Sequence, residues 1–557
     1  MSEAGRTWFN PHSGIANAAS PADKGLLSKN LKNIGLVSVL TMVSRVLGLM
    51  RDSLIAAVFG TSALASAFTT AFTLPNLFRR LLGEGALTAA FVPTLHEELG
   101  ERQHAGAFQL LSQVFTWLLV ATTGIVTLSI VVLLAATEAA QHSHGWGARP
   151  ETVARWLLAA ELAIWLFPYL ILVCAAAALG AALQTLQRFL EPALSPIWLN
   201  LSILALLGAA VTFGWGDGDP GRMRWLCMGV LLGGAFQMLV PGVALMRLGW
   251  RPRFDLRLSP RVNAIARLMA PTLFGSAIYL VNMAVSRFIG LSLDDASATV
   301  LNLASRLMEL PIGLFAVAVT TVIFPLISRY ASLGDWTGMA TAYGKGMRLI
   351  LVMNIPAAAG LALLATPIVR LLFQRGEFSA SDTALTMPVV AVYALGLPFF
   401  SFVNLLLRAF YAQKDTLTPV NAAFFSFLIN LALSLLLMHR LGTIGLALAG
   451  NLAVVFQAVY LQHRLSRRRH ELRFAPMAPD LLKILVATAI MSAAVYGAHH
   501  VSMRYLSTRT LHDVVRIGAI IAIGVTVYGF AIASMRIEGS TGLLRLLVRR
   551  REAPPSA

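Results

Sequence analysis

Residues 107–136 read AFQLLSQVFTWLLVATTGIVTLSIVVLLAA, an apolar run without one charged side chain. As an α-helix, this run is long enough to cross the ~30 Å hydrocarbon core of a bilayer. Comparable runs recur from one end of the chain to the other, and the period-two alternation of a transmembrane β-barrel is absent. The sequence therefore predicts an all-α polytopic membrane protein.

The composition of the 557-residue chain supports this prediction. Hydrophobic residues make up 57% and charged residues 13%, which is too little charge to cover a soluble domain of this length. A net charge of +18 would indicate nucleic acid in a soluble chain. Here it follows from topology, because Lys and Arg gather in loops that stay cytoplasmic. We therefore expect no nucleic-acid partner.

About fourteen spans are predicted, and basic residues concentrate in alternate loops between them. This alternation predicts an even number of spans with both termini cytoplasmic. The expected spans are 33–56, 63–91, 107–136, 153–186, 196–213, 225–248, 262–291, 296–327, 349–373, 384–412, 419–438, 444–462, 481–498 and 514–535.

A faint internal repeat divides the chain into two parts. Leu74-Pro75 in the second span is echoed by Leu310-Pro311 in the eighth, six helices later. The repeat predicts two parallel six-helix lobes with a substrate cavity between them. The expected units are a disordered cytoplasmic tail (1–30), an N lobe (31–250), a C lobe (251–475), two C-terminal helices (476–540) and a basic cytoplasmic tail (541–557).

Ionisable groups inside spans are the informative residues, because a charge at bilayer depth costs ~3 kcal/mol or more unless it faces protein or water. Arg45 and Asp52 share one face of the first span, whereas Arg51 points elsewhere. The full set is Arg45, Arg51 and Asp52 in the first span, Arg79, Arg80 and Glu84 in the second, and Arg306 and Glu309 in the eighth.

These charges allow a structural and a functional interpretation. Arg80 with Glu84, and Arg306 with Glu309, have the spacing of helical ion pairs, so each pair could neutralise itself. Arginines nevertheless outnumber the acids available to them, which indicates an anion from outside the chain. Because arginine binds phosphate bidentately, several arginines around one cavity suit a pyrophosphate. Asn200 in the fifth span could hydrogen-bond either a substrate or a neighbouring helix.

No motif for chemistry was found in the sequence. There is no Walker lysine loop after a strand and no nucleophile–base constellation. His142 and His144 form a lone HxH in an external loop, which favours solvation over metal binding. We therefore expect no enzyme activity, no cofactor and no metal.

At the charged motifs the chain resembles the MurJ (MviN) family of lipid II flippases, in the multidrug/oligosaccharidyl-lipid/polysaccharide (MOP) exporter superfamily with its MATE-like lobes. The resemblance covers about residues 31–535 and rests on segments 44–52, 74–93, 305–311, 373–378 and 410–419. It implies transport of an undecaprenyl-pyrophosphate-linked disaccharide-pentapeptide between leaflets of the bacterial inner membrane by alternating access.

The resemblance also implies roles for particular residues. Arginines at matching positions are functional in the family, and the last two helices form a groove for the lipid tail. The candidate partners are the lipid-linked substrate, membrane lipids and the peptidoglycan synthesis machinery. The candidate substrate-binding residues are Arg45, Arg51, Asp52, Arg79, Glu84, Asn200 and Arg306.

The sequence departs from the family pattern at several positions. Ser66 and Ser305 replace acids that are common in the family, which is expected to leave the cavity more positive. Some members hold sodium with acids in the seventh and eleventh spans. No dedicated sodium site is expected here, because those spans carry Asn282, Ser286, Asn421 and Asn430 instead.

Three alternatives to a lipid II flippase remain open at this point. A flippase for another lipid-linked oligosaccharide would need the same cationic cavity. A non-transporting scaffold for cell-wall assembly is supported only by the two serines. A multidrug cation exporter is disfavoured, because organic cations require acids in the cavity and this cavity offers arginines.

Overall fold

The computed structural model describes residues 21–79, 81, 87–142, 149–505 and 510–535. Regular structure throughout these ranges is helical, without a strand, so the predicted all-α class is confirmed. Nine helices in the described ranges are long and apolar enough to cross a membrane. The count of fourteen spans stays a prediction.

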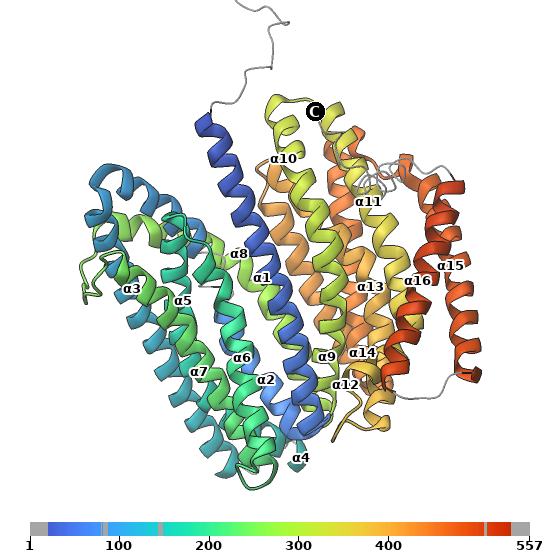
Figure 1. The fold of residues 1–557 in the computed structure, drawn as a ribbon, viewed down its shortest axis with the longest axis horizontal. Coiled ribbons are helices and arrows are strands. Elements are labelled where there is room, and N and C mark those ends of the chain that lie inside the picture. The colour runs from blue at the N-terminus through green and yellow to red at the C-terminus, as the bar shows by residue number, and fades with distance from the viewer. Residues whose placement is uncertain (1–20, 80, 82–86, 143–148, 506–509, 536–557) are drawn as a thin grey trace, which may run out of the picture.

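The helices fall into two groups that separate toward one end of the molecule (Figure 1). The first part of the chain forms α1 (Pro21–Phe59), α2 (Ala63–Phe78), α3 (Leu87–His142), α4 (Pro150–Leu166), α5 (Pro168–Thr185), α6 (Leu190–Thr212) and α7 (Gly218–Arg247). We call these seven helices the N lobe. Within it, α6 packs between α1 and α7, and α5 packs against α3 and α7.

The second part of the chain contains a π-helical turn, η3, and two 3₁₀ turns, η4 and η5. In chain order it forms α8 (Pro260–Leu293), α9 (Ser297–Pro311), η3 (Ile312–Ala316), α10 (Val317–Leu333), α11 (Trp336–Leu363), α12 (Ala365–Phe373), α13 (Ala380–Ala412), α14 (Leu417–Arg468), η4 (His470–Leu472), η5 (Ala475–Met477), α15 (Ala478–Tyr505) and α16 (Thr510–Ser534). We call α8–α14 the C lobe. Helices α15 and α16 pack on each other and on α11.

Several predicted spans are interrupted where the backbone cannot continue a regular helix. Pro168 separates α4 from α5 inside the predicted span 153–186, since proline has no N–H to donate. The eighth predicted span is broken after Pro311 by η3. Gly442 (φ 56°, ψ −135°) turns the chain between the eleventh and twelfth predicted spans inside α14.

The ends of the described chain lie at one end of the molecule. Helix α1 begins at Pro21, within the segment 1–30 that was expected to be a tail, and residues 1–20 lie outside the described ranges. Helix α16 ends near the same end of the molecule as the start of α1 (Figure 1). The predicted even number of spans and the cytoplasmic side of both termini stay predictions.

The two lobes are joined where α1 ends. The backbone N–H of Glu377 donates to the carbonyl of Ala57 at 2.8 Å, and the Ser53 hydroxyl donates to the carbonyl of Leu372 at 2.5 Å. Thr61 donates to the Asp382 carboxylate. These bonds hold the end of α1 and the turn after it to the end of α12, the start of α13 and the segment between them.

A second set of contacts closes the same end from α2 and α4. The Ser66 hydroxyl donates to the carbonyl of Asp295 at 2.5 Å, and Arg155 donates to the Asp295 carboxylate at 2.9 Å. Trp156 donates to Ser292 at 3.0 Å. We call the two sets together the closed end; it joins both lobes on the side opposite the start of α1.

Two glycines allow the backbones to meet at the closed end. Gly376 has a φ of +55°, and a Cβ atom built there would overlap the carbonyl oxygen of Ala57. Gly60 has a φ of +57°, and its Cβ would lie 2.9 Å from the carbonyl oxygen of Glu377. Both positions therefore need glycine for conformation and for close approach.

Candidate functional site

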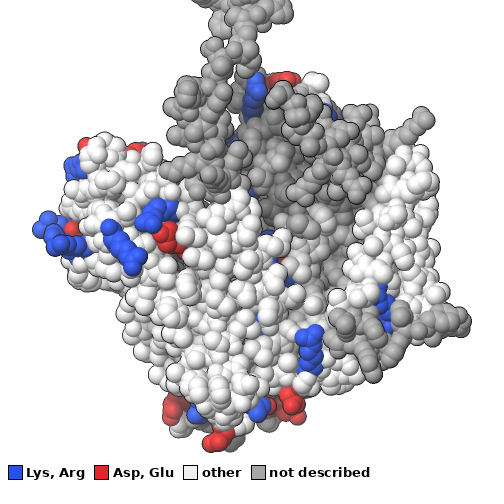
Figure 2. All heavy atoms as spheres, viewed as in Figure 1, with Lys and Arg blue, Asp and Glu red and all other residues white. Residues whose placement is uncertain are grey.

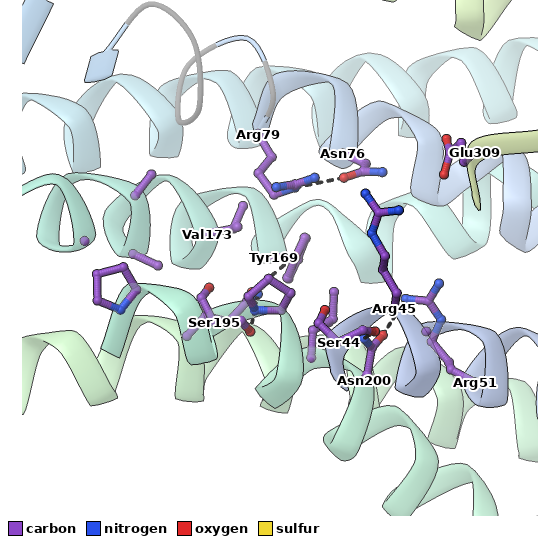
Figure 3. A pocket seen from close by; sticks show the side chains of 18 of the residues that line it. Ser44, Arg45, Arg51, Asn76, Arg79, Tyr169, Val173, Ser195, Asn200 and Glu309 are labelled. Carbon is purple, nitrogen blue, oxygen red and sulfur yellow. Dashed lines mark hydrogen bonds between the residues drawn. The ribbon is translucent and has the colours of Figure 1, made fainter. Parts of the chain in front are cut away.

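A cavity of about 710 Å³ lies between the lobes, on the side of the closed end toward the start of α1. Its lining comes from α1, α2, α5, α6, α7, α9 and η3, and Figure 3 shows part of it. Six of the seven candidate residues line it, which are Arg45, Arg51, Asp52, Arg79, Asn200 and Arg306. The seventh, Glu84, lies outside the described residues, as does Arg80.

Arg51 and Asp52 form the buried floor of the cavity. The Arg51 guanidinium donates to Asp52 Oδ1 through Nε at 3.0 Å and through a terminal nitrogen at 2.7 Å. Its other terminal nitrogen donates to Asn200 Oδ1 at 3.0 Å. Arg51 starts on another face of α1 than Arg45 and Asp52, but its long side chain still reaches the cavity lining.

Asn200 connects α6 to α1 rather than standing alone in the cavity. Its amide accepts from Arg51 and donates to the backbone carbonyl of Ser44 at 3.1 Å. Of the two roles that the sequence left open, the structure shows the contact with a neighbouring helix. Asn200 fixes the direction of the Arg51 guanidinium toward the cavity.

Arg306 links the two lobes across the cavity. Its Nε lies 3.4 Å from Asp52 Oδ2 in the N lobe, and a terminal nitrogen donates to Glu309 Oε2 at 3.0 Å. The predicted pairing of Arg306 with Glu309 is therefore present. Asp52 is shared between two arginines, so it neutralises only part of their combined charge.

Arg45 is not paired with an acid among the residues that the structure describes. Within the described part of the chain it makes no hydrogen bond or ion pair, and its guanidinium lies against the backbone of Gly313 in η3. A Cβ atom at Gly313 would overlap both terminal nitrogens of Arg45. A guanidinium has five N–H donors, and those of Arg45 are available to a ligand.

Arg79 approaches the cavity from the end of α2. Its Nε donates to Asn76 Oδ1 at 2.9 Å, which orients the guanidinium along the cavity wall (Figure 3). Among the described lining residues, the cations are Arg45, Arg51, Arg79 and Arg306, and the carboxylates are Asp52 and Glu309. Even with Arg79 left aside, three guanidinium groups against two carboxylates leave a surplus of positive charge among these residues, which favours an anionic ligand.

One partly buried arginine near the cavity was missed in the sequence analysis. Arg287 in α8 donates to Thr73 Oγ1 at 2.8 Å and lines a smaller space of about 50 Å³. Arg51, Asp52 and Arg306 line that space as well. Arg287 could have been predicted by the same criterion as the other arginines, because it is an ionisable residue inside the predicted span 262–291.

The two serines that replace expected acids lie outside the cavity lining. Ser66 is fully buried at the closed end, where it bonds Asp295 and Thr299, and Ser305 bonds the carbonyl of Asn302 within α9. The expectation that they leave the cavity more positive is therefore wrong. Ser66 instead lies at the contact between the lobes, where α2 packs against α9.

The seventh and eleventh predicted spans meet through neutral groups. The Asn430 amide donates to Asn282 Oδ1 at 2.7 Å and to the Ser286 hydroxyl at 3.3 Å. Ser434 donates to Asn430 Oδ1 at 3.4 Å. No cluster of three or more His, Cys, Asp or Glu suited to a metal was found among the described residues.

Sequence comparisons link the chain to transporters. Residues 55–515 match the family model described as "Lipid II flippase MurJ". A "Probable lipid II flippase MurJ" of Rhizobium meliloti (strain 1021) is 32% identical over 93% of this chain and 96% of its own length. The "Lipid II flippase MurJ" of Burkholderia cenocepacia is 30% identical over 78% of this chain and 83% of its own length.

Comparisons of structure agree with those of sequence. A solved structure titled "Lipid II flippase MurJ, inward closed conformation" superposes with a TM-score of 0.72 at 26% identity, covering 92% of this chain and all of the other. An inward-facing multidrug resistance MATE transporter of the MOP superfamily gives a TM-score of 0.60 at 17% identity, covering 78% and 98%. The second likeness shows a shared fold.

Proposed function

The chain belongs to the MurJ family of lipid II flippases, and from this premise we propose that it moves lipid II from the cytoplasmic to the periplasmic leaflet of the bacterial inner membrane. The observation that carries the proposal is the surplus of guanidinium groups in a cavity between two lobes. A pyrophosphate-linked lipid provides the anion that this surplus requires. An organic cation would be repelled, which disfavours multidrug export.

The arrangement of the lobes supports transport by alternating access. In this conformation the closed end blocks one side of the cavity, and in the proposed orientation that side faces the periplasm. The head group then enters from the cytoplasm and binds Arg45 and its neighbours. Release requires the closed end to open and the opposite end to close. The ligand promotes this change only if its affinities for the two conformations differ.

The ion pair between Arg306 and Asp52 couples binding to this movement. It joins the C lobe to the N lobe at 3.4 Å, on the cavity side of the closed end. A phosphate that takes the donors of Arg306 competes with Asp52 for them. Substrate binding thereby weakens one contact between the lobes.

Membrane potential is the proposed source of energy for transport, since moving one charge across the membrane is worth ~2.3 kcal/mol per 100 mV.

The remaining parts of the proposal concern the lipid tail and partners. Helices α15 and α16 pack together beside α11 and expose large apolar side chains along their length, as expected for a surface that contacts an isoprenoid chain. Lipid II is made and used by the peptidoglycan synthesis machinery, which is the proposed partner. No chemical step is needed, so the protein is proposed to act as a carrier and not as an enzyme.

Reconstitution tests the substrate. Vesicles that contain the purified chain should move labelled lipid II between leaflets faster than empty vesicles. A lipid-linked oligosaccharide with a different glycan is the comparison for the alternative substrate. Binding of lipid II without movement would favour a scaffold, and movement of the other glycan alone would replace lipid II as the substrate.

Orientation has its own prediction. Asp217 is exposed in the loop before α7, and Arg467 is exposed near the end of α14. The native cysteines are buried, so an introduced cysteine is the reactive one. Asp217→Cys should react with a membrane-impermeant maleimide in spheroplasts, and Arg467→Cys should react only after the membrane is opened. The reverse pattern would place both termini outside.

A further inference from the structure

The linker between α7 and α8 lies against the N lobe in an unusual way. Residues 250–259 contain no regular secondary structure, yet their ends and centre are bonded to α3. The indole of Trp250 is buried, packs edge-on against Phe115 at 5.7 Å and donates to Ser112 at 3.0 Å. The linker is therefore held at its start.

Two further polar residues of α3 fasten the centre of the linker. The Thr116 hydroxyl accepts from the backbone N–H of Asp255 at 3.1 Å and donates to the carbonyl of Arg253 at 3.4 Å. Gln113 donates to the Asp255 carboxylate at 3.1 Å and accepts from Ser259 at 2.8 Å. Gln113 and Thr116 are both buried, and their polar groups form hydrogen bonds with the linker in place of water.

The position of these bonds along α3 sets the depth of the linker. Between His104 and Glu138 helix α3 carries no ionisable side chain, and this run is its membrane-spanning part. Gln113 and Thr116 lie about 14 and 18 Å beyond His104 at the rise of an α-helix. The run is about 20 Å longer than the hydrocarbon core, so if the core is centred on it, the two contacts lie about 4 and 8 Å inside the core edge on the His104 side.

The linker alternates two kinds of exposed side chain at that depth. Phe254 is 72% exposed, Leu256 47% and Leu258 59%. The exposed basic residues between and beside them are Arg251, Arg253 and Arg257. Figure 2 shows Lys and Arg side chains, with some Asp and Glu among them, on this flank of the N lobe beside a broad uncharged surface.

The single acid of the linker leaves its positive charge in excess. Hydrogen bonds from the backbone N–H of Arg257 and from Gln113 hold the pKa of Asp255 below its usual range, so Asp255 is ionised at neutral pH. One carboxylate oxygen accepts from Gln113 in α3, and the other accepts from the backbone N–H of Arg257, whose guanidinium lies 4.0 Å from it. Asp255 balances at most Arg257, so Arg251 and Arg253 leave the linker with an excess of positive charge.

We infer that residues 250–259 form a lipid-binding surface that takes the phosphate groups of anionic phospholipids in the leaflet nearest the start of α1. Phe254, Leu256 and Leu258 enter the upper acyl region, and the arginines reach outward to the phosphates. Because the linker is fastened to α3 and then leads into α8, which packs on α3 as well as on α14, bound lipid holds the N-lobe side of the connection between the lobes. The inference does not depend on which substrate is moved.

Lipid contact can be tested directly with the full chain. Phe254→Cys, labelled with bimane, should be quenched by brominated phosphatidylcholine in vesicles and only weakly by aqueous iodide. The buried native cysteines stay unlabelled, which keeps the signal specific. Strong iodide quenching with no quenching by the brominated lipid would place the linker in water and overturn the inference.

The charge requirement needs a matched pair of variants. Arg251→Gln/Arg253→Gln/Arg257→Gln should lower the affinity for phosphatidylglycerol at least about tenfold, measured as lipid retained in native mass spectrometry. The control Arg149→Gln/Arg222→Gln/Arg224→Gln removes the same charge on the other side of the molecule and should retain the lipid. Equal retention by both variants would overturn anionic recognition by the linker, even where Phe254 contacts lipid.

Discussion

Replacing Arg45 with alanine should abolish flipping of lipid II while leaving the amount of folded protein in the membrane unchanged. Arg45 lines the cavity and, among the described residues, has no partner to lose. Two charge-assisted hydrogen bonds to a phosphate are worth ~3 kcal/mol, and each 1.4 kcal/mol is a factor of ten. We expect a loss of about 100-fold in lipid II binding and in transport by reconstituted vesicles.

Two companion variants separate charge from geometry. Arg45→Lys keeps the charge but loses the planar fork, so it should recover only a small part of the activity. Gly313→Ala keeps Arg45 but displaces its guanidinium, because the new methyl group takes the same place. Arg224→Ala removes an exposed arginine far from the cavity and serves as the control. Full transport by Arg45→Ala would remove the anion site from the proposal.

Replacing Gly376 with alanine should open the closed end. The alanine methyl group would overlap the carbonyl oxygen of Ala57, and this clash is with backbone, which cannot rotate away. The bond from Glu377 to Ala57 would be lost with it. Since this contact is made only while the end is closed, the change favours the state that is open to the periplasm.

Accessibility of the cavity from outside measures this shift. Ala177→Cys places a thiol in the cavity lining, and its reaction with an impermeant maleimide added outside should rise by about tenfold or more when Gly376 is alanine. Gly214→Ala is the matched control. Gly214 also has a positive φ, of +65°, but no atom lies within 4 Å of its Cβ position. Both alanines carry the same backbone strain, so equal labelling would show that closure does not depend on the Gly376 contact.

Local patterns were sufficient for the fold class and for most of the cavity. The cost of burying a charge in hydrocarbon applies to every sequence, so Arg45, Arg51 and Arg306 inside apolar runs are enough to indicate a protected polar site. The same criterion also points to Arg287, which was not among the predicted residues. Breaks within spans were harder to predict, because a membrane helix tolerates Pro where neighbouring helices satisfy the freed backbone groups.

The pairings inside the cavity followed from packing between distant segments. Spacing along α1 separates Arg51 from the face of Arg45 and Asp52, but α6 places Asn200 where the long Arg51 side chain can bond it. Likewise, Ser66 was expected beside the arginines, and the packing of α2 on α9 puts it at the closed end instead. Sequence periodicity predicts on which face of its own helix a residue lies. A contact between two residues depends also on how their two helices are placed relative to each other.

Hydrophobicity and charge are properties of single residues, and they act through a bilayer that is the same solvent for every span. They therefore determined from the sequence that this chain is helical, spans a membrane and carries arginines inside its spans. Which cavity arginine lacks a partner within the described ranges, where the lobes close and how the linker is fastened to α3 depend on contacts between distant residues, such as Arg306 and Asp52. Those residues are hundreds of positions apart, and only the packed helices bring them within bonding distance.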